Sequence, residues 1–159
     1  MKFIRGLLKH KVDEGFFGVW SRQMAYILGF TFADGSIYKT TLAWDVQKRD
    51  KDILDKISKA VSSTYPISLH RNASFRLRIH NQMFVQSAIT RGLLPKKNMR
   101  NILPVIPSEF VRHFVRGYLE GDGWIVLRNG RNEADIGFAS GNQSFLELLS
   151  KTITRFLKI

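Results

Sequence analysis

The 159-residue sequence contains no cysteine, only four prolines and few acidic residues. The absence of cysteine excludes a disulfide scaffold, thiolate metal sites and cysteine nucleophiles, and it favours a reducing intracellular location, in the cytoplasm or in an organelle. No apolar run approaches the ~20 residues that a membrane-spanning helix needs, so we expect no membrane partner. The hydrophobic content of 44% is typical of a folded chain.

The scarcity of acids leaves a large excess of positive charge. Lys and Arg total 25 against 13 Asp and Glu, which gives a formal net charge of +12. Such self-repulsion destabilises a compact chain and favours a polyanionic partner. Nucleic acid is the leading candidate, an anionic membrane surface is the second, and a merely basic protein is the third. The membrane alternative is weak, because no helix pattern combines a basic face with a wide apolar one.

Hydrophobic periodicity and turn residues predict an α+β fold with an internal repeat. An αββαββα unit precedes a proline-rich linker, and a partial copy, αββα, follows it. The expected caps of four helices are Ser21, Asp50, Ser108 and Ser144. The expected segments are a loosely structured lead-in (1–20), a first unit (21–100), a linker (101–107) and an incomplete second unit (108–159).

Two predicted helices carry stripes of small residues. Ala25, Gly29 and Ala33 are spaced four residues apart in the first, and Gly117 and Gly121 in the second. Glycine inside a helix costs about 0.5–1 kcal/mol relative to alanine. A stripe of small residues offsets this cost by letting another backbone approach closely. The alternative is tight packing within one core, but we expect these two helices to pack on each other.

Both helices end in Asp-Gly, at Asp34 and at Asp122. A carboxylate at a helix C-terminus is unfavourable, because that end carries partial negative charge. One copy would be read as an ordinary Asp-Gly turn. Two copies in a basic chain, brought side by side by the glycine stripes, predict a site for a divalent cation such as Mg²⁺ (or Mn²⁺).

These two segments resemble the paired signatures of the LAGLIDADG homing endonucleases. The first reads ILGFTFADG over residues 27–35, and the second reads VRGYLEGDG over residues 115–123. The resemblance extends over about residues 16–157. It implies two units related by a pseudo-two-fold axis through the signature helices, in a monomer that hydrolyses one phosphodiester bond in each strand of double-stranded DNA.

The resemblance also implies roles for individual residues near the scissile phosphate. Asp34 and Asp122 would bind the metal, assisted by the backbone carbonyls of Ala33 and Gly121. Gln47 matches the polar residue beside the metal-bound water. Lys97 matches the basic one, with Lys96 as its alternative and an ordinary linker lysine as the other reading. Ala139-Ser140 stands where the second unit would carry the equivalent of Gln47.

The predicted ribbons supply donors for DNA recognition. The major groove admits a two-stranded ribbon. The second hairpin of the first unit presents a polar face without acids, formed by His70, Arg76, Arg78 and His80. Further expected contacts are Lys39, Thr41, Arg49, Arg71 and Arg128. There are two alternatives. The face could be an ordinary solvated strand surface, or the histidines could bind a metal.

Two functions remain open at this stage. The first is a homing-type DNA endonuclease, encoded within an intron or intein. The second is a non-cleaving DNA- or RNA-binding protein on the same fold, such as a repressor-like binder or an intron maturase. The second unit lacks a second hairpin and a third helix. Its open sheet edge offers a route to self-association.

Overall fold

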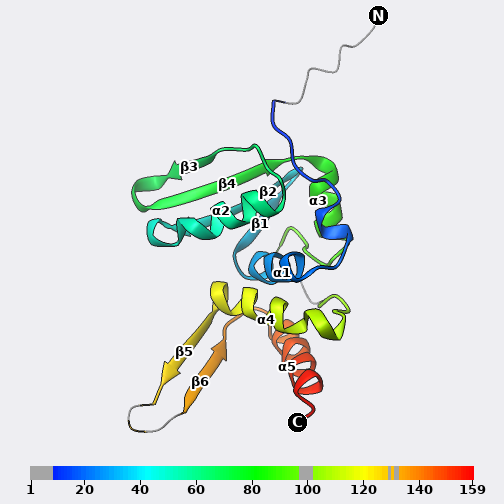
Figure 1. Ribbon diagram of the computed structural model, residues 1–159, viewed down its shortest axis with the longest axis vertical. Helices are drawn as coiled ribbons and strands as arrows, with labels where there is room; N and C mark the ends of the chain where they lie inside the picture. The colour runs from blue at the N-terminus through cyan, green and yellow to red at the C-terminus, as the bar shows by residue number, and fades with distance from the viewer. Residues whose placement is uncertain (1–8, 97–101, 129, 131–132) are drawn as a thin grey trace, which may run out of the picture.

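The chain forms two units of unequal size in a computed structural model that describes residues 9–96, 102–128, 130 and 133–159 (Figure 1). The first unit contains α1 (Arg22–Asp34), β1 (Gly35–Tyr38), β2 (Thr41–Gln47), α2 (Lys51–Ala60), β3 (Ile67–His70), β4 (Ser74–His80) and α3 (Gln82–Ile89). The second contains α4 (Ser108–Asp122), β5 (Gly123–Leu127), β6 (Ala134–Phe138) and α5 (Gln143–Leu157). Short 3-10 turns lie at Phe16–Gly18, Lys48–Asp50 and Arg71–Ala73. The expected order, αββαββα and then αββα, is confirmed.

The first unit is built on an antiparallel sheet with strand order β1-β2-β4-β3. In the central pair, Leu42 lies opposite Ile79 and Trp44 opposite Leu77. All four side chains are fully buried. Because successive residues of a strand point to opposite faces, the intervening polar residues form the other face of the sheet. The predicted alternation is confirmed for β2 and β4.

Helices cover the apolar face of this sheet. The core cluster includes Leu54 and Ile57 from α2 and Phe84 from α3. Trp44 reaches α1, where its indole Nε1 donates a 3.0 Å hydrogen bond to the Thr31 hydroxyl. This bond satisfies the indole N–H within the core, where an unpaired donor would be costly.

The caps of the helices agree only in part with the sequence. The Ser21 side chain accepts a 3.0 Å hydrogen bond from the first turn of α1, as expected. The cap of α5 is wrong: Asn142, not Ser144, accepts the hydrogen bond from the first turn. Ser108 is the first residue of α4 rather than its cap, and Asp50 precedes α2 without a capping side-chain bond.

The described part of the lead-in, residues 9–20, is packed, contrary to the expected loose structure. Phe17 is fully buried. The Arg91 guanidinium, at the end of the first unit, donates 2.7 Å hydrogen bonds to the carbonyls of Phe17 and Gly18. The Trp20 ring stacks on Phe110, with ring centroids 6.0 Å apart. The lead-in therefore links the first unit to α4.

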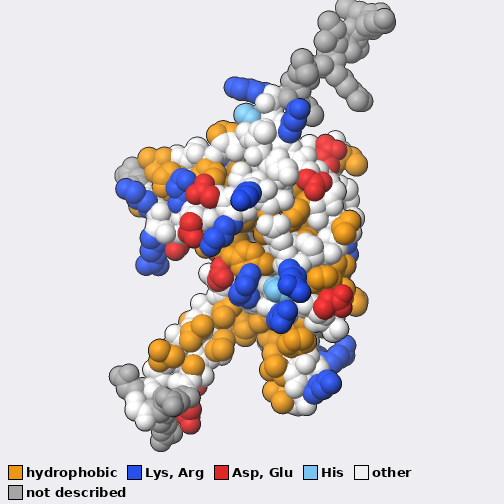
Figure 2. All heavy atoms as spheres, viewed as in Figure 1, with side chains coloured by type: hydrophobic (Ala, Val, Ile, Leu, Met, Phe, Trp, Pro, Cys, Tyr) orange, Lys and Arg blue, Asp and Glu red, His pale blue; other side chains and the backbone are white. Residues whose placement is uncertain are grey.

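The second unit is smaller and more exposed. Its sheet has the two strands β5 and β6. Figure 1 shows this hairpin and α5 diverging from α4, and Figure 2 shows hydrophobic side chains along the hairpin. The exposed fractions of five large apolar side chains lie between 51% and 75%, those of Trp124, Ile125, Val126, Leu127 and Ile136. None of the helices in the described part of the chain is both long and apolar enough to cross a membrane.

Candidate functional site

The glycine faces of α1 and α4 pack on each other at backbone distance. A Cβ placed on Gly29 would lie 2.0 Å from the carbonyl oxygen of Phe114 in α4. A Cβ on Gly117 would lie 2.0 Å from the carbonyl oxygen of Tyr26 in α1. Neither distance leaves room for a methyl group. The predicted packing of the two helices is therefore confirmed, and the two contacts mirror each other.

The same packing brings the ends of the two helices together. A Cβ on Gly121 would lie 2.4 Å from the Ala33 Cβ and 3.1 Å from the Asp34 carboxylate oxygen Oδ2. Asp122 is the last residue of α4, and its carbonyl accepts a 2.7 Å hydrogen bond from the Ala139 N–H. Both signature acids thus stand at adjoining helix ends, each followed by a strand.

A cleft of about 570 Å³ opens beside these helix ends. It is lined by Asp34 and Gly121 from the signatures and by Gln47 from the end of β2. Gln47 thus shares this cleft with Asp34, while its role beside a metal-bound water stays a prediction. Further carboxylates line the cleft, those of Asp45, Asp50 and Glu120. Oxygen atoms of this kind are the preferred ligands of Mg²⁺.

The second unit has no equivalent of Gln47. Gly35 pairs with Trp44, and Gly123 pairs with Phe138 in the same way. The residue three positions after Phe138 is Gly141, which therefore matches Gln47 in place of the expected Ala139-Ser140. Since glycine has no side chain, one polar side chain is missing from this side of the junction.

Lys97, the predicted basic residue, lies outside the described residues. Lys96 is described and exposed. The assignments of Lys97 and Lys96 both stay predictions.

The outer face of the first sheet holds the predicted recognition residues. Arg78 and His80 are exposed on β4. His80 faces Thr41 across the strands, and its ring Nδ1 lies 3.0 Å from the Thr41 hydroxyl. Arg76 is less free than expected, because β2 places Asp45 opposite it. Its guanidinium makes two hydrogen bonds with that carboxylate, which raises the pKa of Arg76.

The remaining predicted contacts lie at the ends of strands. Arg49 and Arg71 converge on one open groove, together with Gln47 and Lys48. Lys48 was not among the predicted contacts, although it directly follows Gln47. His70 pairs with Ser74 at the edge of the same sheet. The Lys39 ammonium lies 5.3 Å from the centroid of the Tyr38 ring.

Arg128, the one predicted contact from the second unit, is bound to a neighbour on its own hairpin. Its guanidinium donates hydrogen bonds of 2.8 and 3.0 Å to the Asp135 carboxylate. Both side chains are about half exposed, so this pair is screened by water. Arg128 thus carries less free charge than the sequence indicates.

Glu120 is a site residue that the sequence reasoning passed over. It occupies the position in the second signature where Phe32 stands in the first. Tyr26 of α1 donates a short hydrogen bond to it, and Arg116 lies 4.7 Å above the Tyr26 ring. Burial, followed by this hydrogen bond, raises the pKa of Tyr26. A carboxylate in place of an aromatic residue is the signal that could have identified it.

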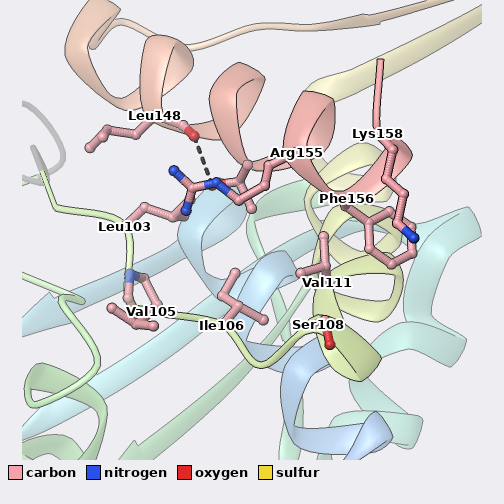
Figure 3. Close-up of a pocket in the computed structure, with 11 residues that line it drawn as sticks. Leu103, Val105, Ile106, Ser108, Val111, Leu148, Arg155, Phe156 and Lys158 are labelled. Carbon is pink, nitrogen blue, oxygen red and sulfur yellow. Dashed lines mark hydrogen bonds between the residues drawn. The ribbon is translucent and has the colours of Figure 1, made fainter.

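A second hollow, of about 440 Å³, lies between α5 and the segment before α4 (Figure 3). Leu103, Val105, Ile106 and Phe156 point into it. None of its lining residues lines the cleft at the helix ends. It therefore adds apolar surface to the second unit but no ligand for the cleft.

Comparisons with known proteins match these features. Residues 109–156 match the family model described as LAGLIDADG-like domain. The chain is 28% identical over 140 residues to a probable translation initiation factor IF-2 of Thermococcus kodakarensis, and 24% identical to that of Methanocaldococcus jannaschii. Each match covers 82% of this chain but 11% of the relative. The chain thus spans about a ninth of the length of these relatives.

Solved structures share the fold. The LAGLIDADG meganuclease I-CpaMI, bound to uncleaved DNA, superposes with a TM-score of 0.50 at 11% identity, over 88% of this chain and 73% of that one. The I-LtrWI LAGLIDADG homing endonuclease, bound to target DNA, gives a TM-score of 0.50 at 10% identity, over 87% and 72%. With the match of residues 109–156 to the LAGLIDADG-like domain and the paired signature helices, this chain has the fold of the LAGLIDADG endonucleases, with a partial second unit.

Proposed function

We propose that this chain is a site-specific DNA endonuclease of the homing type, which hydrolyses phosphodiester bonds in both strands. The observation that carries the proposal is the junction of α1 and α4. Their backbones touch at Gly29 and Gly117, and both helices end in an acid. Asp34 lines the cleft at this junction, and the two neighbours of Asp122, Gly121 and Gly123, line it as well. Two solved structures of this fold are described as bound to DNA. One chain supplies both signature helices, so we propose a monomer.

A divalent cation, Mg²⁺ or Mn²⁺, fits this donor set. Asp34 and Asp122 would hold it, with the carbonyls of Ala33 and Gly121. The described residues contain no group of three or more His, Cys, Asp or Glu suited to a metal ion. Two carboxylates leave coordination positions for water and phosphate oxygens, as Mg²⁺ prefers. Such a cation supplies an activated water and stabilises the leaving oxygen.

The residues around the cation site would position water and DNA. The Gln47 side chain lines the cleft next to Asp34 and can orient a water by hydrogen bonds. The groove formed by Gln47, Lys48, Arg49 and Arg71 adjoins this point. Its cationic side chains suit the phosphate backbone leading away from the scissile bond. Arg78 and His80 would then read base edges in the major groove.

The length of the relatives supports an inserted element. The matched segment is about a ninth of each initiation factor, as an endonuclease inserted in a longer polypeptide would be. We therefore propose an intein-type origin and an intracellular location, where the target DNA is. The target would be the host sequence without the insertion.

One observation favours a second candidate, a DNA- or RNA-binding protein that does not cleave. The second sheet has two strands where the first has four, and it lacks a match for Gln47. Binding through the first unit would survive this difference better than cleavage of both strands. The following experiment separates the two candidates.

Cleavage is measured on a plasmid library with randomised inserts, in Mg²⁺ and in EDTA. We expect linear product in Mg²⁺ alone, and the sequences depleted from the library define the site. Asp34→Asn and Asp122→Asn should abolish cutting while leaving DNA binding in a mobility-shift assay. Asp55→Asn, a matched change on the exposed side of α2, should cut normally. Cutting by both signature variants would refute the metal assignment, and binding without cutting by the native chain would support the second candidate.

The same binding assay, repeated over a range of salt concentrations, tests the DNA interface. Counterion release makes log K fall linearly with log salt, by about 0.9 for each phosphate contacted. Arg71→Gln should reduce this slope by about one unit. A salt-independent affinity would contradict the proposed interface.

A further inference from the structure

Another pocket, of about 490 Å³, lies along α1 and α4 and is separate from the apolar hollow beside α5. Its lining includes Arg22 from α1, Lys56 from α2, and His113 and Arg116 from α4. Figure 2 shows blue basic side chains gathered around a pale blue histidine over these helices. Twelve residues separate Arg22 from Asp34, which is roughly 18 Å of helix. The pocket and the cleft beside Asp34 therefore lie mostly along different parts of the helices and share one lining residue, Glu120.

The positive charge in this pocket is not neutralised by the surrounding acids. No salt bridge among the described residues includes Arg22, Arg112 or Arg116. Burial, followed by these three guanidinium groups, lowers the pKa of His113. Two acids lie nearby. Asp52 is paired with Lys56 at 3.1 Å, and Glu120 accepts the hydrogen bond from the Tyr26 hydroxyl. Two arginines of the lining, Arg22 and Arg116, thus remain against one carboxylate. The Arg112 guanidinium lies beside His113, with its Nε 3.3 Å from the His113 Nε2.

The packing of the two helices does not require these charges. Aligning the signatures by Asp34 and Asp122 places Ala25 opposite His113, Leu28 opposite Arg116, and Phe32 opposite Glu120. The α1 residues are all buried and apolar, and Phe32 stacks on Phe145 of α5 with centroids 5.5 Å apart. These three positions of the repeat thus belong to the hydrophobic core in α1 and line or border the cationic pocket in α4.

The side chains also have the geometry of an oxyanion site. Arg116 stacks over the Tyr26 ring, which restricts the plane of its guanidinium. A guanidinium held in this way can present two N–H donors to a phosphate group. Arg22 comes from the other helix, and His113 lines the same pocket, with its Nε2 accepting a 3.3 Å hydrogen bond from Arg112. Donors from two helices that meet in one hollow suit a tetrahedral oxyanion better than a flat surface would.

We propose that the pocket formed by Arg22, His113 and Arg116 binds a phosphate-type oxyanion, independently of the cleft at the helix ends. Two sources share this chemistry: a small phosphate compound, and a phosphodiester of a nucleic acid strand that leaves the recognition sheet. Glu120 lines both the pocket and the cleft, so the two sites are contiguous.

The test follows the His113 ring by NMR on the full chain. His113→Asn assigns its signal among the four histidines. The probes are inorganic phosphate, pyrophosphate and a single-stranded oligonucleotide, added without divalent metal. A bound oxyanion favours the charged imidazole, so we expect the His113 titration to move to higher pH. Six charged groups surround the pocket, those of Arg22, Lys56, Arg112, Arg116, Glu120 and Asp52. A bound oxyanion would add its negative charge to that of the two carboxylates.

Variants identify the site and its ligand. Arg116→Gln should weaken binding by about tenfold or more, because a charge-assisted pair is lost. Arg116→Lys should restore part of it, and Arg155→Gln, the same change on α5, should have no effect. A response to phosphate or pyrophosphate assigns a small ligand, and a response to the oligonucleotide alone assigns a nucleic acid strand. No movement of His113 with any probe, or the same movement in Arg22→Gln/Arg116→Gln, would overturn the proposal.

Discussion

The contact between Gly121 and Ala33 allows the packing of α1 on α4 to be tested by exchanging one methyl group. A Cβ added at Gly121 would lie 2.4 Å from the Ala33 Cβ. That is roughly 1 Å closer than the 3.5 Å at which carbon atoms reach contact. Overpacking of this kind costs about 1–3 kcal/mol, and helix propensity returns about 1 kcal/mol when alanine replaces glycine. Gly121→Ala should therefore lower the free energy of unfolding by about 1 kcal/mol.

The reverse substitution, Ala33→Gly, completes a double-mutant cycle with Gly121→Ala. Ala33→Gly loses about 1 kcal/mol of helix propensity and about 1 kcal/mol for the buried methyl group. In the double variant the propensity changes cancel and the methyl moves to the opposite helix. Its stability should be close to that of the native chain, which gives a coupling energy of about 3 kcal/mol between the two sites.

The assay is urea unfolding of the native chain, both single variants and the double variant. Gly18→Ala is the control, since nothing lies within 4 Å of a Cβ there. Gly29→Ala should destabilise the chain without a compensating partner substitution. Its Cβ would meet the Phe114 carbonyl oxygen, a backbone atom that no side-chain substitution removes. Additive effects of Gly121→Ala and Ala33→Gly would refute the contact between the helices.

Three further predictions concern stability and association. Thr31→Val leaves the buried indole N–H of Trp44 without its acceptor and should lower the free energy of unfolding by about 1–3 kcal/mol in urea unfolding; an unchanged midpoint would contradict the hydrogen bond. Because the pKa of Tyr26 is raised in the folded state, the unfolded chain ionises first above about pH 10, so stability should fall there; Tyr26→Phe should flatten this fall in unfolding at pH 9–11, and an unchanged pH profile would argue against the Glu120 bond. The proposed monomer should self-associate at high concentration through its open β6 edge and exposed apolar residues, which Ile136→Lys should reduce in sedimentation velocity. A native chain that stays monomeric at every concentration would contradict the self-association but not the monomeric active form.

Local patterns predicted the parts of the fold that depend on local interactions. The glycine stripes required a close backbone neighbour, and the repeat of the stripe on α1 and α4 indicated that each is the neighbour of the other. The alternation in β4 placed Leu77 and Ile79 in the core and Arg78 and His80 outside. These inferences succeeded because side-chain period and residue size act within a few residues.

Features that arise from pairing between distant segments could not be predicted. Asp45 neutralises Arg76 because β2 pairs with β4, although 31 residues separate them. The Ser144–Glu147 pattern fits a capping box, but Glu147 instead accepts a 3.0 Å hydrogen bond from Gln143. The register of β5 and β6, which identified Gly141, also depends on the length of the turn between them. The sequence offers alternatives in such cases, and tertiary packing selects among them.

The difference between the two sheets limits where DNA can be read. In the first unit, the face away from the helices carries Asp45, Gln47, Arg78 and His80, whose donors and acceptors suit base edges. In the second unit, the corresponding face carries Trp124 and Val126, both about half exposed, beside Arg128 and Asp135, which are paired with each other. The Trp124 ring also lies across Gly137, where it would block an added Cβ at 2.0 Å. Apolar groups distinguish few base pairs. If the chain acts as proposed, sequence information would therefore reside mainly in the half-site that the first unit covers, while the second unit would contribute the acid of α4.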